Sequence, residues 1–282
     1  MREGTAKLLL NINLLEINRL TEFVKNEYNY DFTNYALASF KRRVANILFE
    51  EKLSTIAELI IKFQTTPSFF SRFLNYITVN VTEMFRDPSF WLYFREELMT
   101  SYCENKKNIK IWHAGCSSGE EVYSMCILLK ELGLLNQTSI TASDIDDNIL
   151  DQAKEGKYPI KQLYTNNKNY KDAGGTNHLA NYTCTDTLHF YINKEIKEAV
   201  TFKKNNLVNE IEIGEFDIIL CRNVLIYFNQ DLQNSVLNTL LKNLKPEGIL
   251  AIGTKESLIW CDNFKNFDRL SLEEKTFIKI SD

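Results

Sequence analysis

The side chains best suited to chemistry lie in residues 109–124, IKIWHAGCSSGEEVYS. An apolar run ends at Ala114, small residues from Gly115 onward allow a tight turn, and two carboxylates, Glu120 and Glu121, open a helical pattern. In α/β proteins a strand, turn and helix of this kind binds nucleotide-like ligands. A helix N-terminus attracts anions, but two carboxylates there would repel a pyrophosphate. The turn therefore favours a ligand that carries amino and hydroxyl donors or a positive charge.

Polar side chains also follow three other predicted strands. Asp144 ends the second strand, Asn206 and Leu207 follow the third, and Arg222 and Asn223 follow the fourth. The carboxyl ends of parallel strands meet at one edge of a sheet, where ligands bind. There an acidic side chain can accept hydrogen bonds from both ribose hydroxyls, and an amide beside an apolar side chain can hold an adenine. S-adenosylmethionine, an adenosine with an amino-acid tail and a sulfonium cation, fits such a site.

Alternating strands and helices must position these residues. The pattern predicts strands over 109–114, 139–143, 200–203, 216–221 and 249–252, helices over 148–155 and 231–244, and a final antiparallel pair over 264–270 and 276–280. Such alternation predicts a largely parallel sheet with helices on both faces. A polar stretch, 157–199, interrupts it, with possible short strands over 182–184 and 188–192. An excursion of this length is more often functional than a plain connection.

The region before the sheet has a different organisation. Apolar stripes predict an all-helical domain over residues 1–75, with its last helix over 68–74. An extended linker is predicted over 76–88, and the α/β domain over 89–282. Asp87 and Pro88 resemble a helix start, with the aspartate as N-cap and the proline at the first helical position.

Composition restricts the partners and the environment. The chain has 282 residues, a length more typical of two domains than of one. Its net charge of -4 disfavours nucleic acid as a partner. No uncharged apolar run approaches the roughly 20 residues of a membrane-spanning helix, so no membrane insertion is expected. The six cysteines are scattered without zinc-ligand spacing, which favours reduced thiols in the cytoplasm and no metal site.

Five motifs occur in a specific order: NVTEMFRD, AGCSSGEEVYS, ASDID, NNL and CRNVLIYF. In this order and spacing they resemble the CheR-type chemotaxis receptor methyltransferases, and the resemblance covers most of the chain. It implies a Rossmann-like class I methyltransferase sheet with a small antiparallel β insertion at about 157–199, preceded by an all-helical N-terminal domain. The implied activity is transfer of a methyl group from S-adenosylmethionine to glutamate side chains of a receptor's cytoplasmic helical domain, leaving S-adenosylhomocysteine. A cytoplasmic monomer is expected.

The resemblance also implies roles for individual residues. Glu120 would bind the amino end of the cofactor and Asp144 its ribose. Arg86 or Arg222 would orient the substrate carboxylate, with Tyr227 donating a hydrogen bond or facing the sulfonium. The cofactor contacts implied are Asn80, Thr82, Arg86, Gly115, Glu120, Asp144, Asn206, Leu207, Arg222 and Asn223. The basic side chains that would dock the receptor are Lys41, Arg42 and Arg43.

Plainer interpretations remain open for several of these residues. Asp144 alone resembles a helix N-cap, although Asp146 is the more natural cap for the following helix. Tyr227 resembles a half-buried core aromatic, and the three basic residues resemble a solvated helix face. Two other functions share the same pocket. One is a non-catalytic module that binds S-adenosylmethionine or S-adenosylhomocysteine and signals through its N-terminal helices; the other is methylation of a small molecule or nucleic acid.

Overall fold

The computed structural model describes residues 12–78, 82–103, 106–209 and 213–280, in two compact units. The helical unit comprises Met1–Val79 and Ile226–Gln233. The α/β unit comprises Asn80–Leu225 and Asn234–Asp282. Among the helices in these described ranges, we find none that is both long enough and apolar enough to span a membrane.

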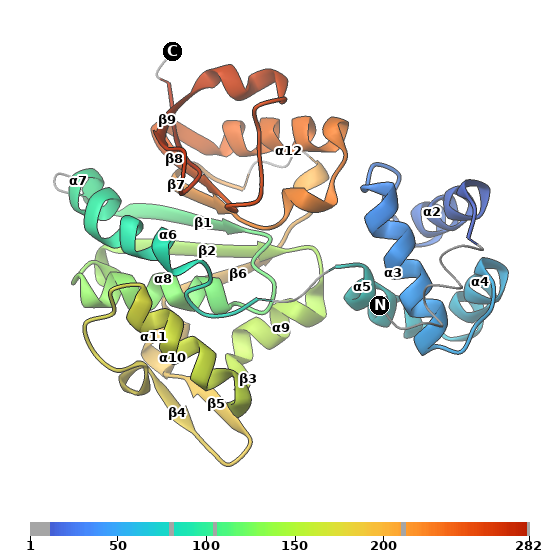
Figure 1. The fold of residues 1–282 in the computed structure, drawn as a ribbon, viewed down its shortest axis with the longest axis horizontal. Helices are drawn as coiled ribbons and strands as arrows, with labels where there is room; N and C mark the ends of the chain where they lie inside the picture. The colour runs from blue at the N-terminus through green and yellow to red at the C-terminus, as the bar shows by residue number, and fades with distance from the viewer. Residues whose placement is uncertain (1–11, 79–81, 104–105, 210–212, 281–282) are drawn as a thin grey trace. The chain divides into compact units, whose positions relative to one another are not determined.

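The helical unit contains α2 (Leu14–Tyr28), α3 (Leu37–Glu50), α4 (Ile56–Thr65) and α5 (Phe69–Ile77), drawn in blue to teal in Figure 1. Asn13 and Glu16 form a capping box that satisfies backbone donors at the start of α2. The apolar stripes face one core, in which Val44 and Phe73 are fully buried. The helices predicted in this region are therefore confirmed, although α5 continues to Ile77, beyond the predicted start of the extended linker.

A short segment from the second half of the sequence completes the helical unit. The Ala36 N–H donates to the carbonyl oxygen of Tyr227 at 2.9 Å, and the Asn229 N–H donates to that of Asn34 at 3.0 Å. A β-bridge joins Tyr35 to Phe228 between these two bonds. The sequence patterns do not indicate this pairing, because its two sides are far apart along the chain.

The α/β unit is built on a seven-stranded sheet with the order β6-β2-β1-β7-β8-β10-β9. The strands are β1 (Ile109–Ala114), β2 (Thr138–Asp144), β6 (Val200–Lys204), β7 (Phe216–Cys221), β8 (Leu244–Ile252), β9 (Phe267–Ser271) and β10 (Thr276–Lys279). The first five in sheet order are parallel, and β10 pairs antiparallel with both of its neighbours. Every residue of β7 is buried, as in a parallel strand covered on both faces. The predicted largely parallel sheet with a final antiparallel pair is thus confirmed.

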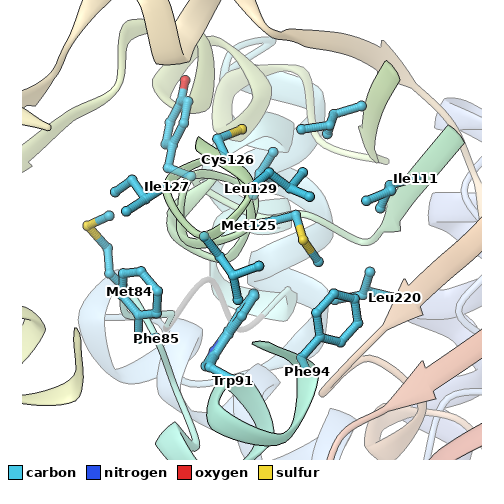
Figure 2. Packing of buried hydrophobic residues seen from close by; sticks show 14 of the residues in the cluster. Met84, Phe85, Trp91, Phe94, Ile111, Met125, Cys126, Ile127, Leu129 and Leu220 are labelled. Carbon is cyan, nitrogen blue, oxygen red and sulfur yellow. The ribbon is translucent and has the colours of Figure 1, made fainter. Parts of the chain in front are cut away.

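Helices pack on both faces of this sheet. They are α6 (Pro88–Tyr93), a π-helical turn (Phe94–Leu98), α7 (Met99–Cys103), α8 (Glu120–Glu131), α9 (Asp147–Glu155) and α12 (Gln230–Asn243), with α8 and α12 on opposite faces (Figure 1). Figure 2 shows Met125 and Leu129 of α8 packed among Trp91, Ile111 and Leu220. Short 3-10 turns span Leu135–Gln137, Ile160–Gln162, Leu179–Asn181, Leu207–Asn209, Leu225–Tyr227 and Asp262–Asn266.

The insertion forms a small antiparallel sheet, as predicted, to which a third, unpredicted strand, β3 (Lys157–Pro159), is added. The other strands are β4 (Thr183–Thr185) and β5 (His189–Ile192), and the strand order of this sheet is β3-β5-β4. Two helices that were not predicted accompany it, α10 (Leu163–Asp172) and α11 (Lys194–Glu198). The Glu131 carboxylate at the end of α8 accepts hydrogen bonds from Tyr170, Tyr182 and Arg95, and so anchors the insertion to the main sheet's helices.

Candidate functional site

The turn after β1 is constrained by the strands beside it. Gly115 has a φ of +76°, and its N–H donates to the Ser143 carbonyl at the end of β2, at 2.8 Å. A Cβ atom at Gly115 would lie 2.6 Å from Cγ2 of Val224, which follows β7. Only glycine combines this backbone conformation with so close a neighbour. The turn is therefore held between β2 and β7, at the carboxyl edge of the sheet.

Glu120 is a buried carboxylate at the start of α8. It is 3% exposed, and the Ser118 hydroxyl donates to its Oε2 at 2.6 Å. Burial raises the pKa of Glu120 to about 7, against the smaller lowering effect of the Ser118 hydrogen bond. Because a cation would compensate for the loss of water, this carboxylate is suited to an ammonium group.

Asp144 and Asp146 have separate tasks. Asp144 Oδ2 accepts the Ser117 N–H at 2.9 Å, and its Oδ1 accepts the Asp146 N–H at 3.2 Å. Burial raises the pKa of Asp144 despite these backbone hydrogen bonds. Asp146 caps α9 by accepting the Asn148 N–H at 2.9 Å. The prediction that Asp146 caps the following helix is therefore confirmed. Asp144 is held at the end of β2, beside the turn.

The residues after β6 include one that the sequence interpretation missed. The Asn205 N–H donates to the Asp144 carbonyl at 2.9 Å, and its side chain is buried with no partner for Nδ2 among the described residues. Asn206 instead uses its Oδ1 to accept the Val208 N–H at 3.1 Å. Leu207 is 7% exposed. The NNL motif indicated the segment after β6, but only packing shows that the amide nitrogen without a partner among the described residues belongs to Asn205.

Arg222 is a buried arginine that contacts two carboxylates. One terminal nitrogen, Nη2, lies 2.8 Å from Asp87 Oδ2, and the other, Nη1, lies 3.2 Å from Glu121 Oε2. The guanidinium carbon is 3.9 Å from the ring centroid of Phe90, and the side chain is 0% exposed. Glu121 also lies 3.0 Å from Nδ1 of His113. The guanidinium is enclosed by these groups, and the predicted role of Arg222 in orienting the substrate carboxylate stays a prediction.

Asp87 occupies the N-cap position of α6 and Pro88 lies in its first turn, as predicted. The φ of Asp87 is +56°, however, and its carboxylate makes no capping hydrogen bond but binds Arg222. Asn223 also has a left-handed backbone, with φ +62°. Its N–H donates to Glu256 Oε2 at 2.9 Å, and the same oxygen accepts the Gly253 N–H at 2.6 Å. Glu256 thus joins the ends of β7 and β8.

The extended linker is anchored in the α/β unit. The Met84 N–H donates to Asn166 Oδ1 at 3.2 Å, and the Met84 carbonyl accepts from Asn169 Nδ2 at 3.1 Å. The Phe85 N–H donates to the Ser124 hydroxyl at 2.8 Å. Arg86 follows at once and is half-buried.

Two other linker residues have predicted cofactor contacts. Thr82, the first described residue of the segment, is half-buried. Asn80 lies outside the described residues. Neither contact is tested by these observations, and both stay predictions.

The predicted docking residues differ in accessibility. Arg42 is exposed and Lys41 is half-buried on α3, but Arg43 is only 6% exposed. Arg43 donates to the Ile77 carbonyl, and its guanidinium carbon lies 4.3 Å from the ring centroid of Tyr227. The assignment of Arg43 to an exposed docking surface is therefore wrong. Tyr227 belongs to the helical unit, and its catalytic role stays a prediction.

The residues of the turn fit S-adenosylmethionine. Glu120 is suited to the amino group, and the left-handed backbone at Gly115 makes the tight turn that places Glu120 after β1. Ser117 Oγ and Asn205 Nδ2 are buried polar atoms without hydrogen-bond partners in the described ranges. We find no arrangement of His, Cys, Asp and Glu within those ranges that suits a metal ion.

Comparisons with known proteins agree with this fit. The family model "CheR methyltransferase, SAM binding domain" matches residues 80–275. The model "CheR methyltransferase, all-alpha domain" matches residues 15–78. The cofactor of the matched domain is thus S-adenosylmethionine.

Relatives match over most of their own length. The protein named "Putative methyltransferase Cher3" of Pseudomonas putida is 38% identical over 265 residues, which cover 94% of this chain and 97% of that protein. Chemotaxis protein methyltransferase 1 of Vibrio cholerae is 33% identical over 232 residues, covering 77% and 80%. The chemotaxis protein methyltransferase of Borreliella burgdorferi is 30% identical over 273 residues, covering 92% and 94%. This chain belongs to the CheR methyltransferase family.

Proposed function

We propose that this protein transfers the methyl group of S-adenosylmethionine to glutamate side chains of a chemotaxis-type receptor, forming glutamate methyl esters. The observation that carries the proposal is the buried, acidic turn at Gly115–Glu120, within a CheR S-adenosylmethionine-binding domain that follows a CheR all-alpha domain. The names of the Vibrio and Borreliella relatives support a chemotaxis role.

In the proposed complex each element holds one part of the cofactor. Glu120 would bind the amino group, Asp144 the ribose hydroxyls, and Asn206 with Leu207 the adenine. When bound, the cofactor supplies an electrophilic methyl group on its sulfonium. Asn205 would add a hydrogen bond through its buried Nδ2, which has no partner in the part of the chain that the structure describes.

The protein must also position the glutamate carboxylate that accepts the methyl group. A glutamate side chain has a reference pKa of about 4.3, so it is ionised near neutral pH and needs no general base. Catalysis then depends on holding carboxylate and methyl in line and on excluding water from both charges. Of the two candidate arginines, Arg86 is the one proposed to orient the carboxylate, because Arg222 already binds Asp87 and Glu121.

A methyl-transfer assay tests this function. The full chain is incubated with S-adenosylmethionine labelled in the methyl group and with receptor cytoplasmic fragments. Label should enter the receptor and be released as methanol by mild base, and replacing the receptor's acceptor glutamates by alanine should abolish the incorporation. Binding of the cofactor without base-labile incorporation would instead favour the non-catalytic signalling module. Label in a small molecule or nucleic acid would contradict the proposed substrate.

A charge reversal on α3 tests the docking surface. Lys41→Glu with Arg42→Glu should raise KM for the receptor roughly tenfold, because two attractive charges become repulsive at an encounter surface. Affinity for S-adenosylhomocysteine, measured by calorimetry, should not change. Arg19→Glu on α2 is the matched control, since Arg19 is also exposed in the helical unit. Equal KM values for the double variant and the control would exclude α3 from docking.

A further inference from the structure

We propose that Asp87 and Glu121 are positioning residues that act through Arg222, holding the linker segment 82–87 against the turn that binds the cofactor. This inference rests on the proposed function, because it concerns how Arg86 is placed for methyl transfer. The juxtaposition that carries it is a chain of contacting polar groups, Asp87, Arg222, Glu121 and His113, centred on the fully buried Arg222 and drawn from the linker, the residue after β7, α8 and β1.

The geometry joins elements that are distant in sequence. Arg222 directly follows β7, Asp87 immediately precedes α6, and Glu121 lies in the first turn of α8. The two terminal nitrogens of the guanidinium each contact a different carboxylate, at 2.8 and 3.2 Å. Phe90 covers one face of the guanidinium. A planar, always charged group with donors on two sides fixes both carboxylates in direction as well as distance.

The segment that this chain holds has an unusual backbone. Phe85 has a φ of +52° and Asp87 a φ of +56°. Residues other than glycine rarely adopt the left-handed region of positive φ, and they do so only where the surrounding structure imposes it. At Phe85 the restraint is the hydrogen bond to Ser124, whose hydroxyl donates to the Glu120 carbonyl at 2.7 Å. At Asp87 the restraint is Arg222. Arg86 lies between these two restraints, and both lead to the first turns of α8.

A purely stabilising role does not explain this arrangement. Asp87 occupies the N-cap position of α6 yet gives up the capping hydrogen bond that would stabilise the helix. Buried ion pairs contribute little net stability, since their attraction only offsets the loss of water. Burial alone would raise the pKa of Glu121, but the His113 hydrogen bond and the Arg222 charge hold it below its ordinary value. Glu121 therefore stays ionised and available to hold Arg222.

The first test replaces Asp87 by asparagine, which keeps the size and removes the charge. The dissociation constant for S-adenosylhomocysteine, or kcat for methyl transfer, should worsen at least about tenfold, as expected when a reacting group is misplaced by a distant change. Asp87→Glu should restore part of the loss, and Glu121→Gln should resemble Asp87→Asn. Lys245→Gln is the matched control, because Lys245 binds Asp217 at the opposite end of β7, also at 2.8 Å. The control should leave both quantities unchanged.

A double-mutant cycle separates positioning from general structural damage. If Asp87 acts by placing Arg86, the combination of Asp87→Asn with Arg86→Ala should be no worse than Arg86→Ala alone. The positioning role would be overturned if the losses in affinity or kcat of the two variants were additive. It would also be overturned if Asp87→Asn had no effect while Arg86→Ala did. Either result would leave the proposed function intact. A silent Arg86→Ala would instead contradict the site assignment within the proposed function. Thermal unfolding of each variant shows whether a loss of function reflects a loss of folded protein.

Discussion

Asp144→Ala is expected to weaken binding of S-adenosylmethionine by at least about a hundredfold. A hydrogen bond to a charged group contributes about 1.5–3 kcal/mol, and two ribose hydroxyls would donate to this carboxylate. Since about 1.4 kcal/mol corresponds to a tenfold change in affinity, the loss of both bonds gives this magnitude. Calorimetric titration with S-adenosylhomocysteine measures it directly.

The control for this prediction is the neighbouring aspartate. Asp146→Ala removes the cap of α9, which is expected to cost about 1 kcal/mol of folding free energy and to leave affinity nearly unchanged. Asp144→Asn separates charge from shape, because an amide oxygen could still accept the Ser117 N–H. An affinity of Asp144→Ala equal to that of the unaltered protein would remove Asp144 from the ribose role.

The affinity for S-adenosylmethionine is expected to rise as the pH increases through about 7. Burial raises the pKa of Glu120 to about 7 in the free protein, so below this pH the carboxyl is protonated and lacks the charge that an ammonium group needs. If the bound state requires the ionised form, affinity falls about tenfold for each pH unit below the pKa. Calorimetry in buffers of different ionisation enthalpy should detect the proton released on binding.

Two variants sharpen this second prediction. Glu120→Gln should bind weakly and lose the pH dependence near neutrality. Ser118→Ala removes a hydrogen bond that lowers the pKa of Glu120, so the midpoint of the pH dependence should move upward. A flat pH profile in the unaltered protein, with no proton released, would contradict the role of Glu120.

The Glu120 carboxyl should make the stability of the folded protein fall as the pH rises, whereas it makes the affinity for the cofactor rise. Its pKa in the folded protein lies above the ordinary value of 4.5, so the folded state binds the proton more tightly than the unfolded state. The stability that it contributes is present below about pH 4.5 and is lost as the pH rises to about 7. The cofactor should reverse this loss, because it binds the ionised form. Urea unfolding with and without S-adenosylhomocysteine at pH 5 and pH 7 would show the difference.

The sequence alone determined the features that depend on local pattern. The apolar run at Phe216–Cys221 identifies a central parallel strand, because a strand covered on both faces must be apolar throughout. The turn at Gly115 and the cap at Asp146 follow from backbone conformations that few residue types satisfy. These signals depend on neighbours in the chain, so the position of the candidate turn at the carboxyl edge of the sheet was predictable.

The tertiary structure decided which side chains meet. The pairs that join Arg222 to Asp87 and Glu121 span 135 and 101 residues, and no local periodicity encodes such partners. Arg43 became a buried contact of Tyr227 rather than a surface charge for the same reason. The raised pKa of Glu120 also depends on burial that only packing produces. Local sequence therefore determined the helices, the strands and where they end. Long-range packing determined which charged side chains pair and which are buried, because ion-pair geometry and the loss of water exist only in the folded chain.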